Sequence, residues 1–146
     1  MSLHSPPDRG FIIIVNFELG GTLGAEMTGT MRPCVVVQNN RLHRGPLVTV
    51  VPISTTAPEP AMPWHHELDH MSFRAWPISW GGQGLPRWAK CDYITTVSLE
   101  RCEHPYSKTR DGGRRYTRVR ITRTDLEAVE GCVQWALGIQ APEPGV

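Results

Sequence analysis

Short apolar runs alternate along the chain with polar segments rich in Gly and Pro. This punctuation is typical of a small β-rich domain with many turns. The run Ile12-Ile13-Ile14-Val15 is apolar on both faces, which indicates a strand covered on both sides, as in a curled sheet. The pattern predicts strands over residues 10–17, 34–38, 47–53, 88–97 and 116–121, and a weaker one over 64–68.

A helical period appears only near the C-terminus. Thr124 and Glu127 form a capping box, so we expect a helix to begin at Thr124, and Gly138 is placed to end it. Apolar residues recur there at steps of three and four, at Leu126, Val129, Val133, Ala136 and Leu137, with Cys132 and Trp135 widening the stripe. We interpret the segment as an amphipathic helix that closes a barrel or a sheet.

The length of 146 residues fits one domain, which we place at residues 10–138, between flexible ends at 1–9 and 139–146. No stretch approaches the roughly 18 apolar residues of a membrane span, and the chain does not open with a signal-peptide pattern. We therefore expect a soluble, cytoplasmic protein. The four cysteines include no C-x-x-C pair, so we expect reduced, part-buried thiols.

The net charge of +1 does not by itself indicate a nucleic-acid binder, but ten of the fifteen Lys and Arg lie between Arg87 and Arg123. Cations interleaved with aromatic rings are typical of single-stranded RNA recognition. The set is Arg74, Trp76, Trp80, Arg87, Trp88, Lys90, Lys108, Arg110, Arg114, Arg115, Arg118, Arg120 and Arg123. The alternative is that Arg118 and Arg120 form a solvated strand face and that Trp76 and Trp80 cover the core.

Two segments at the ends of predicted strands could bind an anion. Arg32, with Pro33, stands at a loop-to-strand corner, where its side chain can point into a groove or can simply be solvated. Ser54, Thr55 and Thr56 end an aliphatic strand with three hydroxyls, which suit phosphate contacts as well as turn capping.

Lys90 and Asp92 are two residues apart in the predicted strand 88–97, so we expect both side chains on one face. A carboxylate that accepts a proton and a fixed cation that stabilises charge on phosphorus suit acid–base chemistry at a phosphodiester. The alternative is an ordinary ion pair on the sheet.

The sequence His66-Glu67-Leu68-Asp69-His70 matches H-E-x-x-H, which binds zinc when it lies on a helix. Pro63 and Pro77 bracket the segment, and Phe73 and Trp76 replace the glycine and third histidine of the extended motif. A zinc hydrolase is therefore a minor alternative.

Several short motifs occur in a recognisable order: Arg9-Gly10, Glu26-Met27, Arg32-Pro33-Cys34-Val35-Val36-Val37, Val50-Val51-Pro52-Ile53-Ser54, Lys90-Cys91-Asp92 and Thr96-Val97. Over roughly residues 9–138 the chain resembles the MazF/PemK (Kid) toxin family. The resemblance implies a mainly β fold, a small SH3-like barrel of the CcdB/MazF type with a C-terminal amphipathic helix, and a homodimer. It also implies a sequence-selective endoribonuclease of a type II toxin–antitoxin pair that needs no metal or cofactor.

The resemblance also implies roles for individual residues. Arg32, Asp92, Lys90 and Ser54 are the catalytic candidates, by a mechanism in which the ribose 2′-OH attacks its own phosphodiester. The RNA-binding candidates are Thr55, Thr56, Glu26, Trp88, Arg87, Trp76 and Trp80. Ala25 departs from relatives that have histidine before Glu-Met. The expected partners are single-stranded mRNA and an antitoxin with an acidic segment, with no membrane. The main alternative is a non-enzymatic toxin, such as a CcdB-like gyrase binder, or an inactive relative.

Overall fold

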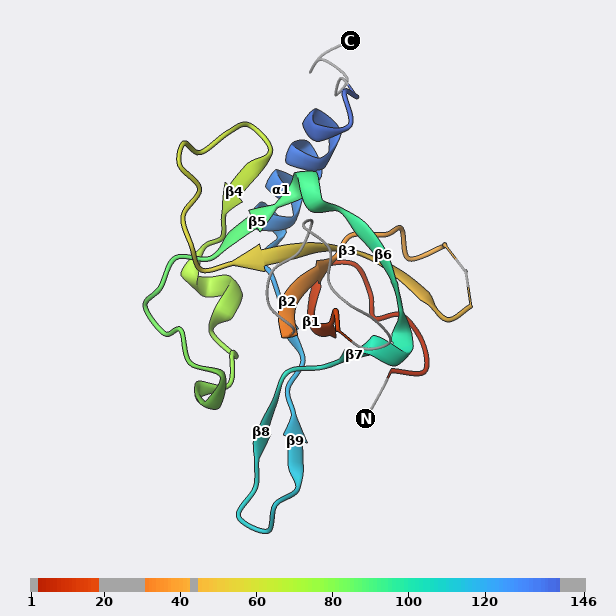
Figure 1. Ribbon diagram of the computed structural model, residues 1–146, viewed down its shortest axis with the longest axis vertical. Helices are drawn as coiled ribbons and strands as arrows, with labels where there is room; N and C mark the ends of the chain where they lie inside the picture. The colour runs from red at the N-terminus through yellow and green to blue at the C-terminus, as the bar shows by residue number, and fades with distance from the viewer. Residues whose placement is uncertain (1–2, 19–30, 43–44, 140–146) are drawn as a thin grey trace.

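A strongly curled antiparallel sheet forms the body of the protein, and an α-helix lies against it near the C-terminus (Figure 1). The computed structural model describes residues 3–18, 31–42 and 45–139. The strands are β1 Phe11–Asn16, β2 Met31–Val36, β3 Leu47–Ser54, β4 His65–Glu67, β5 Trp88–Lys90, β6 Thr95–Ser98, β7 Cys102–Glu103, β8 Tyr106–Lys108, β9 Arg114–Tyr116 and β10 Val119–Arg120. The helix α1 is Arg123–Ala136, and four 3₁₀ turns are η1 His70–Phe73, η2 Ile78–Trp80, η3 Cys91–Tyr93 and η4 Leu99–Arg101.

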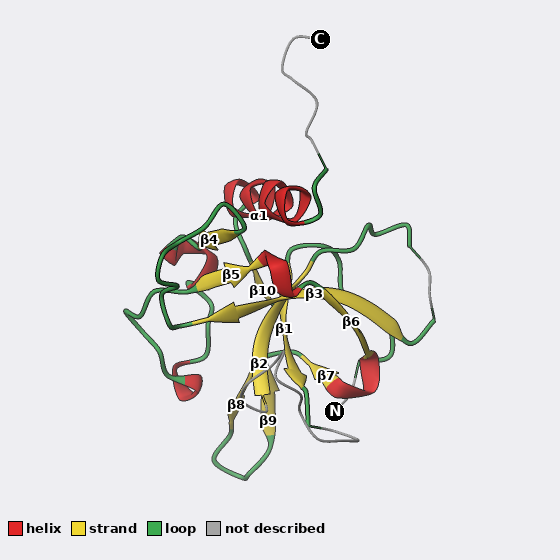
Figure 2. Cartoon of the chain, turned by 45° about the horizontal axis from the view of Figure 1, so that its top comes forward, coloured by secondary structure: helices red, strands yellow, loops and turns green. Residues whose placement is uncertain are grey.

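The sheet has the strand order β10-β1-β2-β3-β5-β4, with β6 also paired to β3 and β7 to β1. The strands β8 and β9 form a separate hairpin. The helix crosses one side of the sheet above β4 and β5 (Figure 2). The prediction of a mainly β fold with one C-terminal amphipathic helix is confirmed.

Both faces of the sheet are covered, as the doubly apolar run in β1 predicts. Ile12 and Ile14 belong to a core cluster that includes Val129 of α1, so we call this side the α1 face. Ile13 and Val15 point the other way, into a second cluster closed by Leu99 of η4, which we call the η4 face. The four residues are 0% exposed, which shows that the curl wraps both sides of β1.

The single strand predicted over 88–97 is wrong. Both β5 and β6 pair with β3, through Ile53↔Ala89 and Val50↔Thr95. A continuous strand would advance three residues between these two pairs, whereas the chain advances six, so three residues are surplus. The surplus forms the turn η3. The strand predicted over 116–121 is likewise divided, between β9 and β10.

The helix begins before the predicted capping box. Thr122 is the N-cap, and its side chain accepts a hydrogen bond from the Asp125 backbone N–H at 3.1 Å. Thr124 is exposed, and Glu127 pairs with Arg123. The predicted apolar stripe is confirmed at its N-terminal half, where Val129 is fully buried.

The ends of the described chain contact the body. The Leu3 backbone N–H donates to the Cys102 carbonyl at 3.1 Å, and Arg9 pairs with Glu130 of α1 at 2.5 Å. Gly138 has φ +72°, a left-handed conformation that favours glycine, at the predicted end of the helix. The four cysteines, predicted to be part-buried thiols, are free; Cys34, Cys91 and Cys102 are buried and Cys132 is half-buried. Among the described residues, no helix has the length and apolar character to cross a membrane.

Candidate functional site

Four polar or aromatic side chains form a row across the η4 face of the sheet. Cys34 lies opposite Pro52, so alternation along the strands places Arg32 and Ser54 on the same face, at the same end of β2 and β3. Ser54 lies opposite Trp88 on β5, and Trp88 lies opposite Glu67 on β4. The row therefore joins a cation, a hydroxyl, an indole and a carboxylate from four strands.

Lys90 belongs to the next position of the same face, opposite His65 of β4. The expectation that Asp92 stands beside Lys90 on one strand is wrong, because β5 ends at Lys90 and Asp92 lies in η3. In the described part of the chain, no ion pair joins the two. Asp92 is exposed and belongs to the surplus residues between β5 and β6. Extra residues in one strand of a pair commonly re-aim side chains next to active sites.

The predicted hydroxyl run forms a turn at the end of β3. Ser54 is only 8% exposed, and its Oγ accepts a hydrogen bond from the Thr56 backbone N–H at 3.1 Å. Ser54 therefore caps the turn, as the alternative interpretation of the hydroxyl run expects. Its own O–H can still donate a hydrogen bond. Thr55 and Thr56 are exposed beyond it.

Arg32 is the second residue of β2, because the strand begins at Met31 rather than after the Arg-Pro pair. It lies opposite Val15 of β1 and is half-buried. Burial raises the pKa of the Cys34 thiol well above its usual range, and the neighbouring Cys102 raises it further, while the positive charge of Arg32 opposes both effects. The positive charge of Arg32 therefore acts on a thiol that is buried in the sheet. Ala25 and the RNA-binding candidate Glu26 lie outside the described residues.

Arg87, Trp76 and Trp80 lie elsewhere, in an aromatic layer over the α1 face. Trp76 is part of the core cluster on this face, and Trp80 packs against it. The Arg87 guanidinium carbon lies 4.4 Å from the centre of the Phe73 ring and 5.0 Å from the Trp76 ring. Trp80 Nε1 donates to the Tyr106 carbonyl at 2.6 Å. The core-covering alternative thus holds for both tryptophans, and the RNA-binding role of all three residues stays a prediction.

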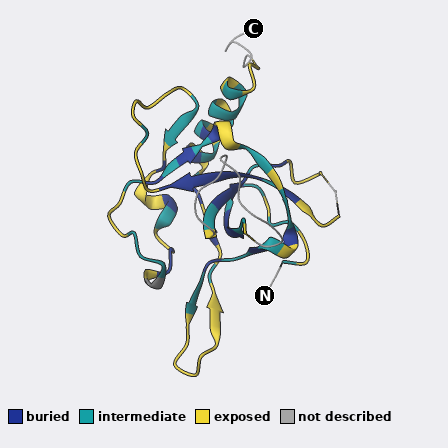
Figure 3. Cartoon of the chain, in the orientation of Figure 1, coloured by how far each residue is buried: buried dark blue, intermediate teal, exposed yellow. Residues whose placement is uncertain are grey.

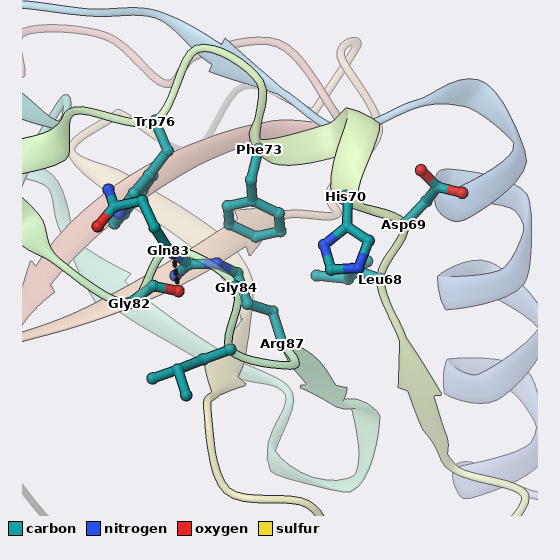
Figure 4. Close-up of a pocket in the computed structure, with 10 residues that line it drawn as sticks. Leu68, Asp69, His70, Phe73, Trp76, Gly82, Gln83, Gly84 and Arg87 are labelled. Carbon is teal, nitrogen blue, oxygen red and sulfur yellow. Dashed lines mark hydrogen bonds between the residues drawn. The ribbon is translucent and has the colours of Figure 1, made fainter.

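A pocket of about 140 Å³ opens beside Arg87, and Figure 4 shows the guanidinium under the Phe73 ring with His70 at the rim. Arg87 is 8% exposed, and its Nη2 donates to the Gly82 carbonyl at 3.2 Å. Burial lowers the pKa of Arg87. Among the described residues no carboxylate pairs with it, so two rings and backbone carbonyls hold this cation.

The H-E-x-x-H segment does not form the helix that zinc binding by two histidines requires. His66 and Glu67 end the strand β4, and His70 begins η1. His66 Nε2 instead contacts Asp125 Oδ1 at 2.9 Å. Within the described ranges no three His, Cys, Asp or Glu side chains gather as a metal site would need. The structure therefore contradicts the helical arrangement behind the zinc hydrolase alternative.

A comparison with protein families assigns most of the chain to one family. The model of the PemK-like, MazF-like toxins of type II toxin–antitoxin systems matches residues 8–137. The chain belongs to this toxin family. A search of the curated proteins found no match to the sequence.

Solved structures of this family share the fold. An endoribonuclease in complex with its cognate antitoxin from mycobacterial species has a TM-score of 0.60 at 18% identity, with 94% of this chain and 100% of that chain covered. The Mycobacterium tuberculosis toxin MazF-mt6 has a TM-score of 0.54 at 15% identity, with 90% and 99% covered. A MazE–MazF complex from Deinococcus radiodurans has a TM-score of 0.53 at 17% identity, with 92% and 97% covered. The expected MazF-type fold is confirmed.

Sequence reasoning missed two members of this face of the sheet. His65 and Glu67 flank His66, and alternation sends them to the η4 face while His66 points to α1. The signal that could have found them is a two-residue spacing inside a short strand. The weak strand predicted over residues 64–68 contains this spacing, but the sequence does not show with which strand it pairs.

Proposed function

We propose that this family member is the toxin of a type II toxin–antitoxin pair and acts as a sequence-selective endoribonuclease on single-stranded RNA, without a metal ion. The family match over residues 8–137 carries the proposal. The candidate site supports it, since Arg32, Ser54 and Lys90 share the η4 face and Asp92 is exposed on the adjoining turn.

The proposed reaction is an intramolecular transesterification. The ribose 2′-oxygen forms a bond to phosphorus while the bond from phosphorus to the 5′-oxygen breaks. Asp92 accepts the 2′-hydroxyl proton as general base, and the leaving 5′-oxygen takes a proton from solvent. The products are a 2′,3′-cyclic phosphate and a 5′-hydroxyl.

The two cations stabilise charge rather than transfer a proton in this scheme. Arg32 offers a planar fork of N–H donors that matches two phosphate oxygens, and Lys90 adds a point charge. Ser54, Thr55 and Thr56 position phosphate oxygens, and the Trp88 ring offers a surface for a base. Because neither cation releases a proton readily at neutral pH, electrostatic stabilisation is the role we assign to both.

The proposed assembly is a homodimer whose antitoxin competes with RNA. An antitoxin segment rich in Asp and Glu would meet the same cations that hold phosphate, so the two ligands would exclude one another. A complex with a neutral partner that is insensitive to salt would contradict this part of the proposal.

The experiment that tests the function is incubation of the purified protein with a long, weakly structured RNA in excess EDTA, followed by mapping of new 5′ ends. Cleavage at a short recurring sequence, with 5′-hydroxyl ends, is expected. Intact RNA after incubation with folded protein would contradict the proposal and favour the non-enzymatic binding toxin.

A further inference from the structure

The β8–β9 hairpin is an insertion within what would otherwise be one strand beside β1. Glu103 of β7 lies opposite Ile14, and Val119 of β10 lies opposite Ile12 on the same strand. One residue would suffice to bridge the gap opposite Ile13, yet residues 104–118 occupy it. The extra chain projects away from the sheet as a two-stranded arm (Figure 1).

The arm carries a charge opposite to that of the rest of the chain. Residues 104–118 hold five of the fifteen Lys and Arg and one of the fourteen Asp and Glu, so without them the net charge would change from +1 to −3. Lys108, Arg110 and Arg115 are exposed, and in the described part of the chain none of them pairs with a carboxylate. A fold gains little from such charges, which points to a polyanionic partner.

Rings and cations share one face of this arm. Tyr106 lies opposite Tyr116, and Lys108 lies opposite Arg114, so alternation gathers all four side chains on the same side. Tyr116 is 39% exposed, and every residue of β9 is exposed (Figure 3). Rings that stack on bases beside cations that hold phosphates are the two parts of a single-stranded nucleic-acid surface.

The arm has a fixed attachment to the body. The Tyr106 ring packs edge-on against Trp80 at 5.3 Å between centroids, and the Arg114 guanidinium lies 4.2 Å from the centre of the Tyr106 ring. Arg114 also pairs with Glu103 at 2.9 Å, at the base of the arm. These contacts hold the base of the hairpin in one orientation.

The base of the arm lies close to the candidate catalytic arginine. Val15 has Arg32 opposite it on one edge of β1 and Cys102 on the other, next to Glu103. Two strand spacings, about 10 Å, therefore separate the backbone of Arg32 from that of Cys102, two residues before the arm begins. An RNA strand that runs from Arg32 across β1 towards β7 would therefore meet the base of the arm.

We propose that the β8–β9 arm is a second RNA-binding surface, which holds the substrate strand outside the cleavage site and takes no part in the chemistry. This inference rests on the proposed function, because it takes RNA as the substrate. Its commitment to RNA rather than to an acidic antitoxin segment rests on the exposed Tyr116 ring beside the cations and on the composition of β9, whose three residues are all exposed and none of them aliphatic.

The test compares two variants with the same loss of charge. In the arm variant, Lys108→Gln and Arg110→Gln are combined; the control is Arg41→Glu, which changes the net charge by the same two units at an exposed arginine outside the basic and aromatic set. The ligand is a 2′-O-methyl RNA of about 20 nucleotides, which cannot be cleaved, and its Kd is measured against salt concentration. Circular dichroism and Tm verify the fold of each.

We expect the arm variant to weaken RNA binding on the order of tenfold at 0.1 M salt and to reduce the slope of log K against log[salt] by about 1.4, since two phosphate contacts are lost. The control leaves both nearly unchanged. On cleavable RNA the arm variant raises KM and leaves kcat intact. Tyr116→Leu weakens binding about fivefold without changing the salt slope, because it removes a ring and no charge.

Three outcomes would overturn the proposal: wild-type Kd and salt slope in the arm variant, equal losses in the control, or a loss confined to antitoxin binding. The proposed function fails separately, because a protein that binds the uncleavable RNA through the arm but cleaves no RNA would keep this inference and lose the other.

Discussion

The two faces of the sheet use similar residues in different ways. On the α1 face, Arg87 is held by two rings and by backbone carbonyls, and Asp125 is held by a histidine, a serine and a backbone N–H. On the η4 face, Lys90 forms no ion pair within the described residues, and Asp92 is exposed on a turn. Charged groups that already have hydrogen-bond, ring or ion-pair partners within the protein stabilise the fold. Charged groups without an ion-pair partner, exposed at the surface, can instead contact a ligand.

Loss of the Asp92 carboxylate, beside the η4 face, should have the largest effect of the changes considered. Asp92→Ala should lower the single-turnover cleavage rate on the order of 1000-fold, because a general base contributes about 10²- to 10⁴-fold. Its Tm should stay at the wild-type value, since the side chain is exposed. A cleavage rate close to wild type would remove Asp92 from the mechanism.

Loss of the Asp125 carboxylate tests the role of charged groups on the α1 face. The group is 3% exposed and accepts hydrogen bonds from the Ser72 hydroxyl at 2.5 Å and from the Asp69 N–H at 2.8 Å. Asp125→Ala should lower the free energy of unfolding by about 3 kcal/mol, because His66 and the other partners lose their acceptor. Urea denaturation measures this loss, and cleavage per folded molecule should be preserved.

The same carboxylate predicts how stability depends on pH. Burial alone would raise the pKa of Asp125, but hydrogen bonds from Ser72, His66 and the Asp69 backbone lower it on balance. A depressed pKa in the folded state means that the stabilisation is present above the unfolded value of about 3.9 and is lost as the pH falls through the folded value. The Tm advantage of wild type over Asp125→Asn should therefore shrink below about pH 4; an advantage that grew there would contradict this account.

Variants of Arg87 distinguish a packing role from an RNA-binding role on the α1 face. Arg87→Ala should lower the free energy of unfolding by about 2 kcal/mol, because it removes the stacking on Phe73 and Trp76 and leaves the pocket wider. Arg87→Lys keeps the charge and shows whether the planar group is needed. If either variant raised KM for RNA severalfold at unchanged Tm, the residue would belong to the RNA-binding surface instead.

The smallest expected effect is at Ser54. Ser54→Ala removes the hydrogen bond to the Thr56 N–H and should cost about 1 kcal/mol of unfolding free energy. Because Ser54 is also proposed to position a phosphate oxygen, the cleavage rate should fall as well; an unchanged rate would leave only the turn-forming role, and Ser54→Thr, which keeps the hydroxyl, is the matched control.

The parts of the fold that could be predicted are those that local pattern decides. The apolar run of β1 and the stripe around Val129 each bury their own residues, so sequence alone places them. The turn η3 and the insertion of β8 and β9 depend on pairing with β3 and β1, which are distant in the chain. Pairing register leaves no local signature, so Asp92 was expected inside a strand.

The candidate site divides in the same way. Arg32 and Ser54 could be singled out because each stands at a strand end with a polar side chain beside an aliphatic run. Their neighbours His65 and Glu67 could not be assigned to this face, although Glu67 stood out in H-E-x-x-H, since only the pairing of β4 with β5 brings them there. Thr122 displaced Thr124 as the N-cap because its backbone N–H finds the Ser72 hydroxyl at 2.9 Å, a tertiary contact that no helix pattern contains.

The central claim is that chemistry belongs to the η4 face, and Arg32 tests it most directly. The single-turnover cleavage rate of Arg32→Ala at saturating RNA, measured in EDTA beside that of Arg87→Lys, compares one arginine from each face. The account predicts a fall of about 100- to 1000-fold for Arg32→Ala, the range for a lost charge-stabilising donor, and a rate within a few-fold of wild type for Arg87→Lys. A wild-type rate for folded Arg32→Ala, or a larger loss in Arg87→Lys, would contradict it.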